Sequence, residues 1–131
     1  ETDRIALSMD IMPTLFEACE IPIKHEIDGV SFLPDLQGED RPQLDRDLFF
    51  RRREGGRKFQ GKTIEAIRRG DWKLLRNKPE APLELYNLKE DPYEENDLAQ
   101  ENTDKLRELQ KALNDQLERY SKVPWQRPSQ R

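Results

Sequence analysis

The densest group of side chains able to bind a charged ligand lies between residues 51 and 62. This stretch holds six basic residues and one acidic residue, a net charge of +5. Arginine presents a planar fork of N–H donors that matches sulfate, phosphate and carboxylate groups. We therefore predict a recognition loop for an anionic ligand; the alternatives are a solvated loop and an ion-pair partner for an acidic segment. The candidate substrate-binding residues are Arg51, Arg52, Arg53, Lys58 and Lys62.

Residue types suited to catalysis and metal binding are scarce. His25 is the single histidine, so a multi-histidine metal cluster is excluded, and its polar surroundings predict a solvated or capping side chain. Cys19, the single cysteine, excludes an intrachain disulfide and is predicted to be buried on the apolar face of a helix. Glu94 and Glu95 are adjacent carboxylates in a polar loop, where nothing places them in a pocket. We predict no catalytic residue and no metal ligand in this chain.

The composition indicates a thin core. Charged residues make up 38% of the 131 residues and hydrophobic residues 34%, whereas roughly 25% charged is typical. A fragment, or a module that leans on a larger partner, has this composition, and a chain that begins with Glu1 is predicted to be a cut or processed piece. The net charge of -4 argues against nucleic-acid binding. No apolar run approaches the roughly 20 residues of a membrane span, so no membrane association is predicted.

Residues 63 to 77 predict a β-hairpin around which the other elements are arranged. A two-residue loop at Arg69-Gly70 is expected, because primed hairpin turns need positive φ and glycine supplies it. This loop pairs Arg68 with Asp71, and it places two apolar pairs on opposite faces, so both faces of the hairpin need cover. The apolar pairs are Ile67 with Trp72 and Ile64 with Leu75.

The remaining elements predict an α+β fold: a small four-stranded antiparallel sheet covered by a long C-terminal helix. Leucines and a tyrosine at helical spacing predict the helix at about residues 103–121, after an acidic segment with a net charge of -5 over residues 89–108. The hairpin supplies strands at about 63–69 and 71–77, the apolar run Leu48-Phe49-Phe50 predicts a strand at about 47–53, and alternation predicts one at about 83–88. Near the beginning of the chain, a helix is expected at about residues 10–19, with Met12, Leu15, Phe16 and Cys19 on one face. A short helical turn is expected at about 31–37, and residues 39–46 are the predicted linker.

Five segments in this order resemble the C-terminal region of the formylglycine-dependent (type I) sulfatases, such as the arylsulfatases and the N-acetylgalactosamine-6-sulfatases. The resemblance covers about residues 5 to 120, and each segment alone is a weak match. The segments are 8–15 (SMDIMPTL), 28–38 (DGVSFLPDLQG), 48–50 (LFF), 66–74 (AIRRGDWKL) and 84–99 (ELYNLKEDPYEENDLA).

The resemblance implies a parent enzyme that hydrolyses sulfate esters with a formylglycine nucleophile and a bound calcium ion. The formylglycine arises in a Cys/Ser-x-Pro-x-Arg motif, and the nearest match here, Cys19 to Lys24, has its proline one position late and lysine in place of arginine. The nucleophile and calcium ligands are therefore expected in a catalytic domain that this chain lacks. Residues 1–38 are then the tail of that α/β domain, and residues 39–131 the C-terminal subdomain.

These implications predict that the chain alone is inactive and that it supports the catalytic domain, with the basic stretch near the substrate rim. The expected substrate of the parent is a sulfated carbohydrate or aryl sulfate, and the family suggests an exported or lysosomal protein. The alternative is a stand-alone binding module for anionic glycans or a protein partner. Apolar surface left without its domain also predicts self-association.

Overall fold

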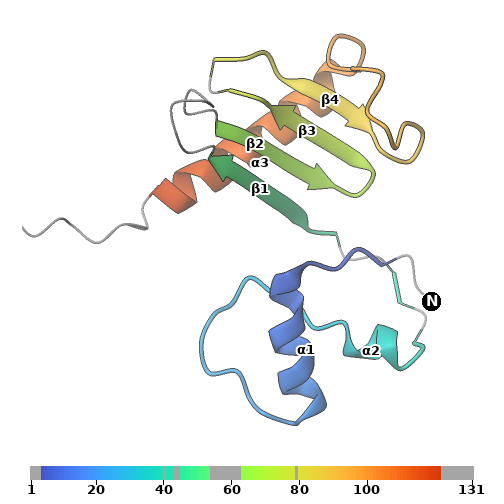
Figure 1. Cartoon of the computed structure of the whole chain (residues 1–131), viewed down its shortest axis with the longest axis vertical. Coiled ribbons are helices and arrows are strands. Elements are labelled where there is room, and N and C mark those ends of the chain that lie inside the picture. The colour runs from blue at the N-terminus through green and yellow to red at the C-terminus, as the bar shows by residue number, and fades with distance from the viewer. Residues whose placement is uncertain (1–3, 40, 43–44, 54–62, 79, 122–131) are drawn as a thin grey trace, which may run out of the picture. The chain divides into compact units, whose positions relative to one another are not determined.

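The computed structural model of the chain describes residues 4–39, 41–42, 45–53, 63–78 and 80–121. The chain divides into two compact units: unit 1 is Glu1–Leu44 and unit 2 is Asp45–Arg131. Figure 1 shows unit 1 as two helices joined by loops, and unit 2 as a sheet with one long helix. The division falls inside the stretch 39–46 that we predicted as a linker.

Unit 1 begins with a 3-10 helix, η1 (Ser8–Asp10), which leads directly into α1 (Ile11–Ala18). Pro13 lies in the first turn of α1, where the missing proline N–H removes no helical hydrogen bond. The chain leaves the helix at Glu20, which takes a left-handed φ of 56°. A second short helix, α2 (Leu33–Leu36), follows. The helix predicted near residues 10–19 is confirmed, and the predicted turn at 31–37 is a single helical turn.

Asp10 connects α1 to the segment that precedes α2. Its buried carboxylate accepts hydrogen bonds from the backbone N–H groups of Leu7 (2.7 Å) and Val30 (2.9 Å). Thr14, one turn along α1, accepts a bond from the N–H of Phe32 (3.1 Å). The Asp10 side chain thereby joins two chain segments twenty residues apart.

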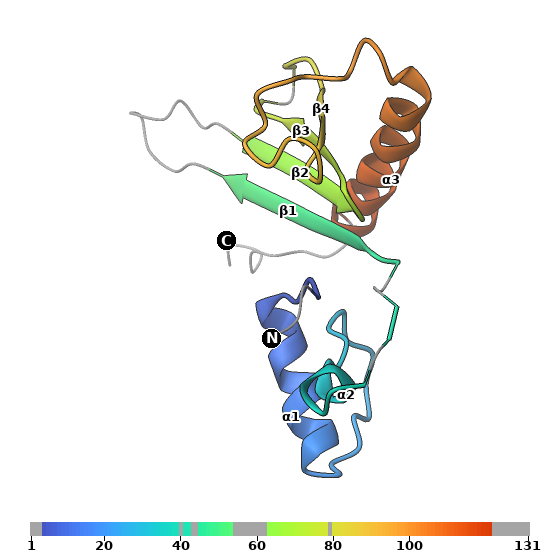
Figure 2. The ribbon, with the colours of Figure 1, turned by 90° about the vertical axis from the view of Figure 1, so that its right-hand side faces the viewer.

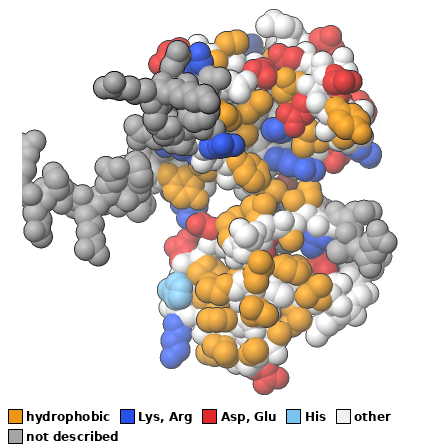
Figure 3. Space-filling model, viewed as in Figure 1, with side chains coloured by type: hydrophobic (Ala, Val, Ile, Leu, Met, Phe, Trp, Pro, Cys, Tyr) orange, Lys and Arg blue, Asp and Glu red, His pale blue; other side chains and the backbone are white. Residues whose placement is uncertain are grey.

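The apolar face predicted for α1 is exposed within unit 1. Leu15 is 58% exposed and Met12 39% exposed, and Cys19 is also exposed. The prediction of a buried Cys19 is therefore wrong for this chain, because α1 turns the opposite side, with Pro13 and Thr14, toward its own unit. Figure 3 shows hydrophobic side chains, in orange, gathered on the surface of this unit.

Unit 2 is a four-stranded antiparallel sheet in the order β1-β2-β3-β4, followed by α3. Figure 2 shows α3 lying along one face of this sheet. The predicted fold class, the four strands and the long helix are confirmed. The elements are β1 (Asp47–Arg53), β2 (Thr63–Arg69), β3 (Trp72–Arg76), β4 (Glu84–Asn87) and α3 (Thr103–Ser121).

The hairpin of β2 and β3 turns one residue later than predicted. The two-residue loop is Gly70-Asp71, and Gly70 alone of the two takes positive φ, 56°. This pattern is typical of a type II′ turn, which has glycine at its first central position; the predicted loop would have forced positive φ on Arg69. The partner of Arg68 is consequently Lys73, not Asp71.

The corrected pairing also changes the apolar partners in the hairpin. Ile67 faces Leu74, not Trp72, and Leu75 faces Ala66, not Ile64. Each partner moves by two positions, so every side chain keeps its predicted face.

One apolar row crosses the sheet beneath α3. Paired positions place Phe49, Ile67, Leu74 and Leu85 side by side on four successive strands. Ile67, Leu74 and Leu85 are completely buried, as are Leu109 and Leu113 of α3. Near the end of α3, the ring of Tyr120 stacks on Phe49 with 5.5 Å between ring centres. This row is the core that α3 closes.

Candidate functional site

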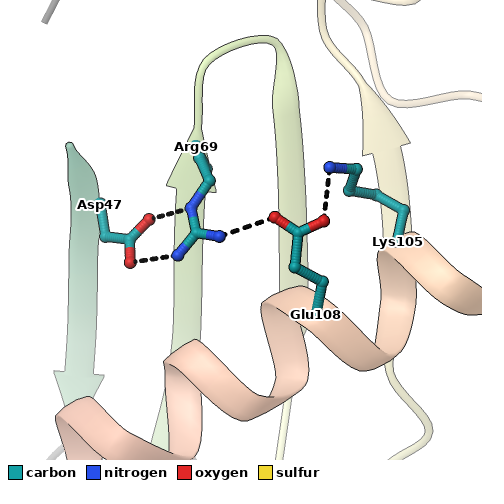
Figure 4. A network of polar contacts seen from close by, with 4 residues as sticks. All are labelled: Asp47, Arg69, Lys105 and Glu108. Atoms are coloured by element: carbon teal, nitrogen blue, oxygen red, sulfur yellow. Dashed lines mark hydrogen bonds and ion pairs between the residues drawn. The ribbon is translucent and has the colours of Figure 1, made fainter. Parts of the chain in front are cut away.

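Charged residues border the apolar row at each end of the strands. At the end near the first turns of α3, Arg69 of β2 binds Asp47 of β1 through two hydrogen bonds, of 2.6 and 2.7 Å. Its third contact reaches Glu108 of α3 (2.6 Å), and Glu108 also accepts a bond from Lys105 (2.6 Å). Figure 4 shows this chain of contacts crossing from β1 through β2 to α3. We call these four residues the closed network, because each charge has an opposite partner.

The closed network shifts the pKa values of two of its members. The hydrogen bond to Asp47, with a smaller contribution from Glu108, raises the pKa of Arg69. Hydrogen bonds from Lys105 and then Arg69 lower the pKa of Glu108. Both shifts favour the charged forms, as expected for ion pairs that hold β1, β2 and α3 together.

At the other end of the strands, three charged residues form a row of direct cross-strand neighbours. Arg51 of β1 pairs with Glu65 of β2, and Glu65 pairs with Arg76 of β3. The Glu65 side chain is 4% exposed; Arg76 contacts its Oε2 through Nη2 (2.5 Å) and Nε (3.1 Å). Arg51 contacts its Oε1 through Nε at 3.2 Å. We call this set the arginine row.

The predicted basic recognition loop lies largely outside the described residues. The side chains of Lys58, Lys62 and Arg53 lie in that undescribed part. Arg51 and Arg52 are exposed and occupy successive positions of β1, so they point to opposite faces of the sheet. The structure brings Arg51 to Glu65, and the substrate-binding role of all five residues stays a prediction.

Sequence reasoning missed Glu65 and Arg76. The predicted register would have placed Glu65 opposite Leu74, where it would interrupt the apolar row. With the observed register its partner is Arg76. The alternation of charge between neighbouring strands is the signal that would have favoured the correct register.

The sheet face opposite α3 carries a shallow hollow of about 400 Å³. Phe50, the most exposed of its apolar residues at 47%, lies on β1. Lys73 extends over this face to Glu94, with Nζ–O distances of 2.6 and 2.7 Å. The hairpin was predicted to need cover on both faces, and α3 supplies one. The hollow is lined by Phe50, Ile64, Ala66, Arg68, Lys73, Leu75, Leu88 and Glu94.

The acidic segment after β4 covers the outer edge of that strand. Leu98 donates its N–H to the carbonyl of Leu85 (2.8 Å), and Asp97 accepts the N–H of Leu85 (2.9 Å). Asp91 accepts backbone N–H groups, led by that of Asn96, and these lower its pKa. The segment therefore satisfies backbone groups that an open edge strand would leave unpaired.

The described residues do not fit the calcium site of the type I sulfatases. None of them forms a group of three or more histidine, cysteine, aspartate or glutamate side chains able to hold a metal ion. Among the described helices, none is long and apolar enough to cross a membrane.

Unit 2 is thus an antiparallel sheet closed by one helix, and both units leave apolar side chains exposed. Residues 1–123 match the family described as "N-sulphoglucosamine sulphohydrolase, C-terminal", and the chain belongs to this family. The suspected sulfatase resemblance is confirmed. No curated protein sequence matches the chain.

Solved structures with the same fold are several times longer than this chain. A Bacteroides thetaiotaomicron protein assigned to the sulfatases is 23% identical, with a TM-score of 0.73, over 92% of this chain and 27% of its own. A 2-O GAG sulfatase is 24% identical, with a TM-score of 0.72, over 87% and 26%. A third structure, solved with its substrate D-glucosamine-2-N,6-O-disulfate, is 25% identical, with a TM-score of 0.69, over 88% and 24%. The chain thus spans about a quarter of the length of these neighbours.

Proposed function

We propose that this chain works as the C-terminal part of a sulfuric ester hydrolase and supports a catalytic domain that supplies the nucleophile and the metal. The family match over residues 1–123 is the observation that carries this proposal. In the type I sulfatases that the sequence resembles, the catalytic domain provides formylglycine and calcium. Residues 1–38 would then belong to the end of that domain, and residues 39–131 to the C-terminal subdomain.

Both units expose apolar side chains, which favours the proposal that this chain packs against a catalytic domain. On unit 1, Leu15 and Leu36 are 58% and 63% exposed, and on unit 2 Phe50 is 47% exposed. Each of these side chains loses about 25 cal/mol per Å² of apolar area left in water. A catalytic domain packed on such surfaces would recover that free energy.

We propose a sulfated carbohydrate or an aryl sulfate as the substrate of the parent protein. A structural neighbour is solved with a sulfated glucosamine as its substrate, and the arginine row offers charge of the matching sign. Arg51, Arg52, Arg53, Lys58 and Lys62 are the residues that we propose at the substrate rim. An exported or lysosomal location follows from the family and belongs to the same proposal.

The test is a sulfatase assay on the full-length parent with sulfated monosaccharides and an aryl sulfate, with this chain alone as the matched control. Turnover by the parent and none by the chain is the expected result. Turnover by the chain alone would contradict the proposal, because this chain lacks a Cys/Ser-x-Pro-x-Arg motif.

A binding module for anionic glycans is the second candidate, favoured by the surplus positive charge of the arginine row. As a stand-alone module, the chain by itself would bind sulfated sugars and hydrolyse none of them. The same panel therefore separates the two functions.

A further inference from the structure

A second apolar row crosses the sheet on the face opposite α3. Paired positions place Phe50 of β1, Ala66 of β2 and Leu75 of β3 side by side, and all three line the hollow on that face. Phe50 is 47% exposed, whereas the row under α3 is closed by Leu109 and Leu113. Because Ala66 is short and stands between two larger side chains, the row is indented at its centre and can receive an apolar side chain from outside.

Two cations on neighbouring strands border this hollow, and they are balanced differently. Arg68 of β2 and Lys73 of β3 are direct cross-strand partners, an arrangement in which like charges destabilise a sheet. Lys73 is neutralised by Glu94, with Nζ–O distances of 2.6 and 2.7 Å. Arg68 donates through Nε to the carbonyl of Gly70 at 2.8 Å, and no carboxylate of the described residues pairs with it. One positive charge at the rim therefore lacks an opposite charge within the described part of the chain.

The contrast with Arg69 shows what Arg68 lacks. Arg69, the next residue of β2, contacts the carboxylates of Asp47 and Glu108. Successive residues of a strand point to opposite faces, so those carboxylates lie on the α3 face and not beside Arg68. A guanidinium that loses water on an apolar surface is stabilised by a carboxylate held in its fork. A partner that covers this face must therefore supply one carboxylate beside an apolar side chain.

The catalytic domain proposed above is the occupant that these features favour. The chain spans about a quarter of the length of its structural neighbours, so a parent of that length has far more chain outside residues 1–131 than within them. A second copy fits less well. The hollow is lined by two bases, Arg68 and Lys73, and one acid, Glu94, a net charge of +1, and two such faces would repel each other. A small anion alone would leave the apolar floor in contact with water.

We propose that the sheet face opposite α3 is the docking surface for the parent's catalytic domain. An apolar side chain of that domain fills the space over Ala66, and an aspartate or glutamate of the same domain binds Arg68. The inference rests on the proposed function for the existence of that domain. It adds the face that is covered, the anchoring residue and the chemistry of the contact.

The first experiment identifies the occupant of the hollow in the full-length parent. Phe50→p-benzoylphenylalanine places a photo-cross-linking group at the exposed aromatic position of the hollow, and mass spectrometry identifies the attached peptide. The expected product joins position 50 to a peptide outside residues 1–131 that contains aspartate or glutamate. The same group at Arg107, which is 75% exposed on α3, is the matched control and should give no such product.

The second experiment compares Arg68→Ala in the parent and in this chain alone. Loss of the contact between the domains should lower the thermal unfolding midpoint of the parent by about 2 °C. In the chain alone the midpoint should stay unchanged or rise, because the substitution removes repulsion from Lys73 and breaks no ion pair. Arg68→Lys keeps the charge without the fork and should lie between Arg68→Ala and the unchanged parent. Arg107→Ala, which loses an exposed pair with Asp104 at 3.3 Å, should change neither midpoint.

The outcomes separate this inference from the proposed function. A cross-link to an acidic peptide outside the chain, with a lower midpoint in the parent alone, supports the inference. No cross-link, cross-links only within residues 1–131 or to a second copy, or equal midpoint changes in parent and chain overturn it. Failure of the proposed function is read separately, as the absence of turnover in the unchanged parent, whichever cross-link is found.

Discussion

Arg69 binds both carboxylate oxygens of Asp47, with Nε–Oδ1 at 2.6 Å and Nη2–Oδ2 at 2.7 Å. The two residues are direct neighbours across β1 and β2. The same guanidinium reaches Glu108 of α3 at 2.6 Å. One side chain thereby connects the edge strand, the central hairpin and the covering helix.

Replacing Arg69 with alanine should destabilise unit 2. The expected loss is about 1 kcal/mol in the free energy of unfolding, because the pair is bidentate but about one-third exposed to water. Urea denaturation of the chain measures it. Arg107→Ala is the control and should change the free energy by less than about 0.5 kcal/mol. Equal effects of the two substitutions would show that the closed network stabilises the chain no more than an exposed surface ion pair does.

The free energy of unfolding should decrease as the pH is lowered, and part of this decrease should depend on Glu108. Its pKa in the folded chain is lowered from 4.5 by Lys105 and Arg69. A lowered folded-state pKa gives stability that is present above 4.5 and is lost as the pH falls through the folded-state value. Unfolding curves of the unchanged chain and Glu108→Gln should therefore differ most near neutral pH and converge in acid. A difference that is constant with pH would contradict this account.

Gly29→Ala should disrupt unit 1. A Cβ atom at this position would lie 2.1 Å from the backbone oxygen of Met9, so one of the two segments must move. The movement separates the N–H of Val30 from Asp10. Hydrogen exchange at the Val30 and Phe32 amides should accelerate, while exchange in β2 and β3 stays unchanged.

Val30→Ala is the matched control for Gly29→Ala, because Val30 is 39% exposed and its backbone bond is retained. Unchanged exchange in Gly29→Ala would show that the close approach to Met9 is not required.

The chain by itself should self-associate through the exposed face of α1. Leu15→Glu places a charge on this face, where Leu15 is 58% exposed, and should shift sedimentation toward the monomer. Tyr93→Glu, at a side chain 84% exposed on unit 2, is the control and should leave the distribution unchanged. A monomeric unchanged chain at all concentrations would contradict this prediction.

Local patterns were sufficient to predict the elements. An apolar run, a glycine turn and one alternating segment predicted the four strands, and the leucine spacing predicted α3 with the bounds observed, Thr103–Ser121. These patterns follow from the geometry of a single strand or helix, so they need no knowledge of distant residues. The arginine row was harder to predict from the sequence. Arg51 was identified by its charge, but its neighbours Glu65 and Arg76 were not identified.

The sequence by itself determined which residues share a face, and the tertiary structure decided which of them meet. The turn moved from Arg69-Gly70 to Gly70-Asp71, which changed every partner in the hairpin and left every face as predicted. Face depends on the alternation along one strand, whereas register depends on the turn and on packing against neighbours. Asp10 illustrates the same limit, because its role as a link to Val30 exists only once the chain has folded back.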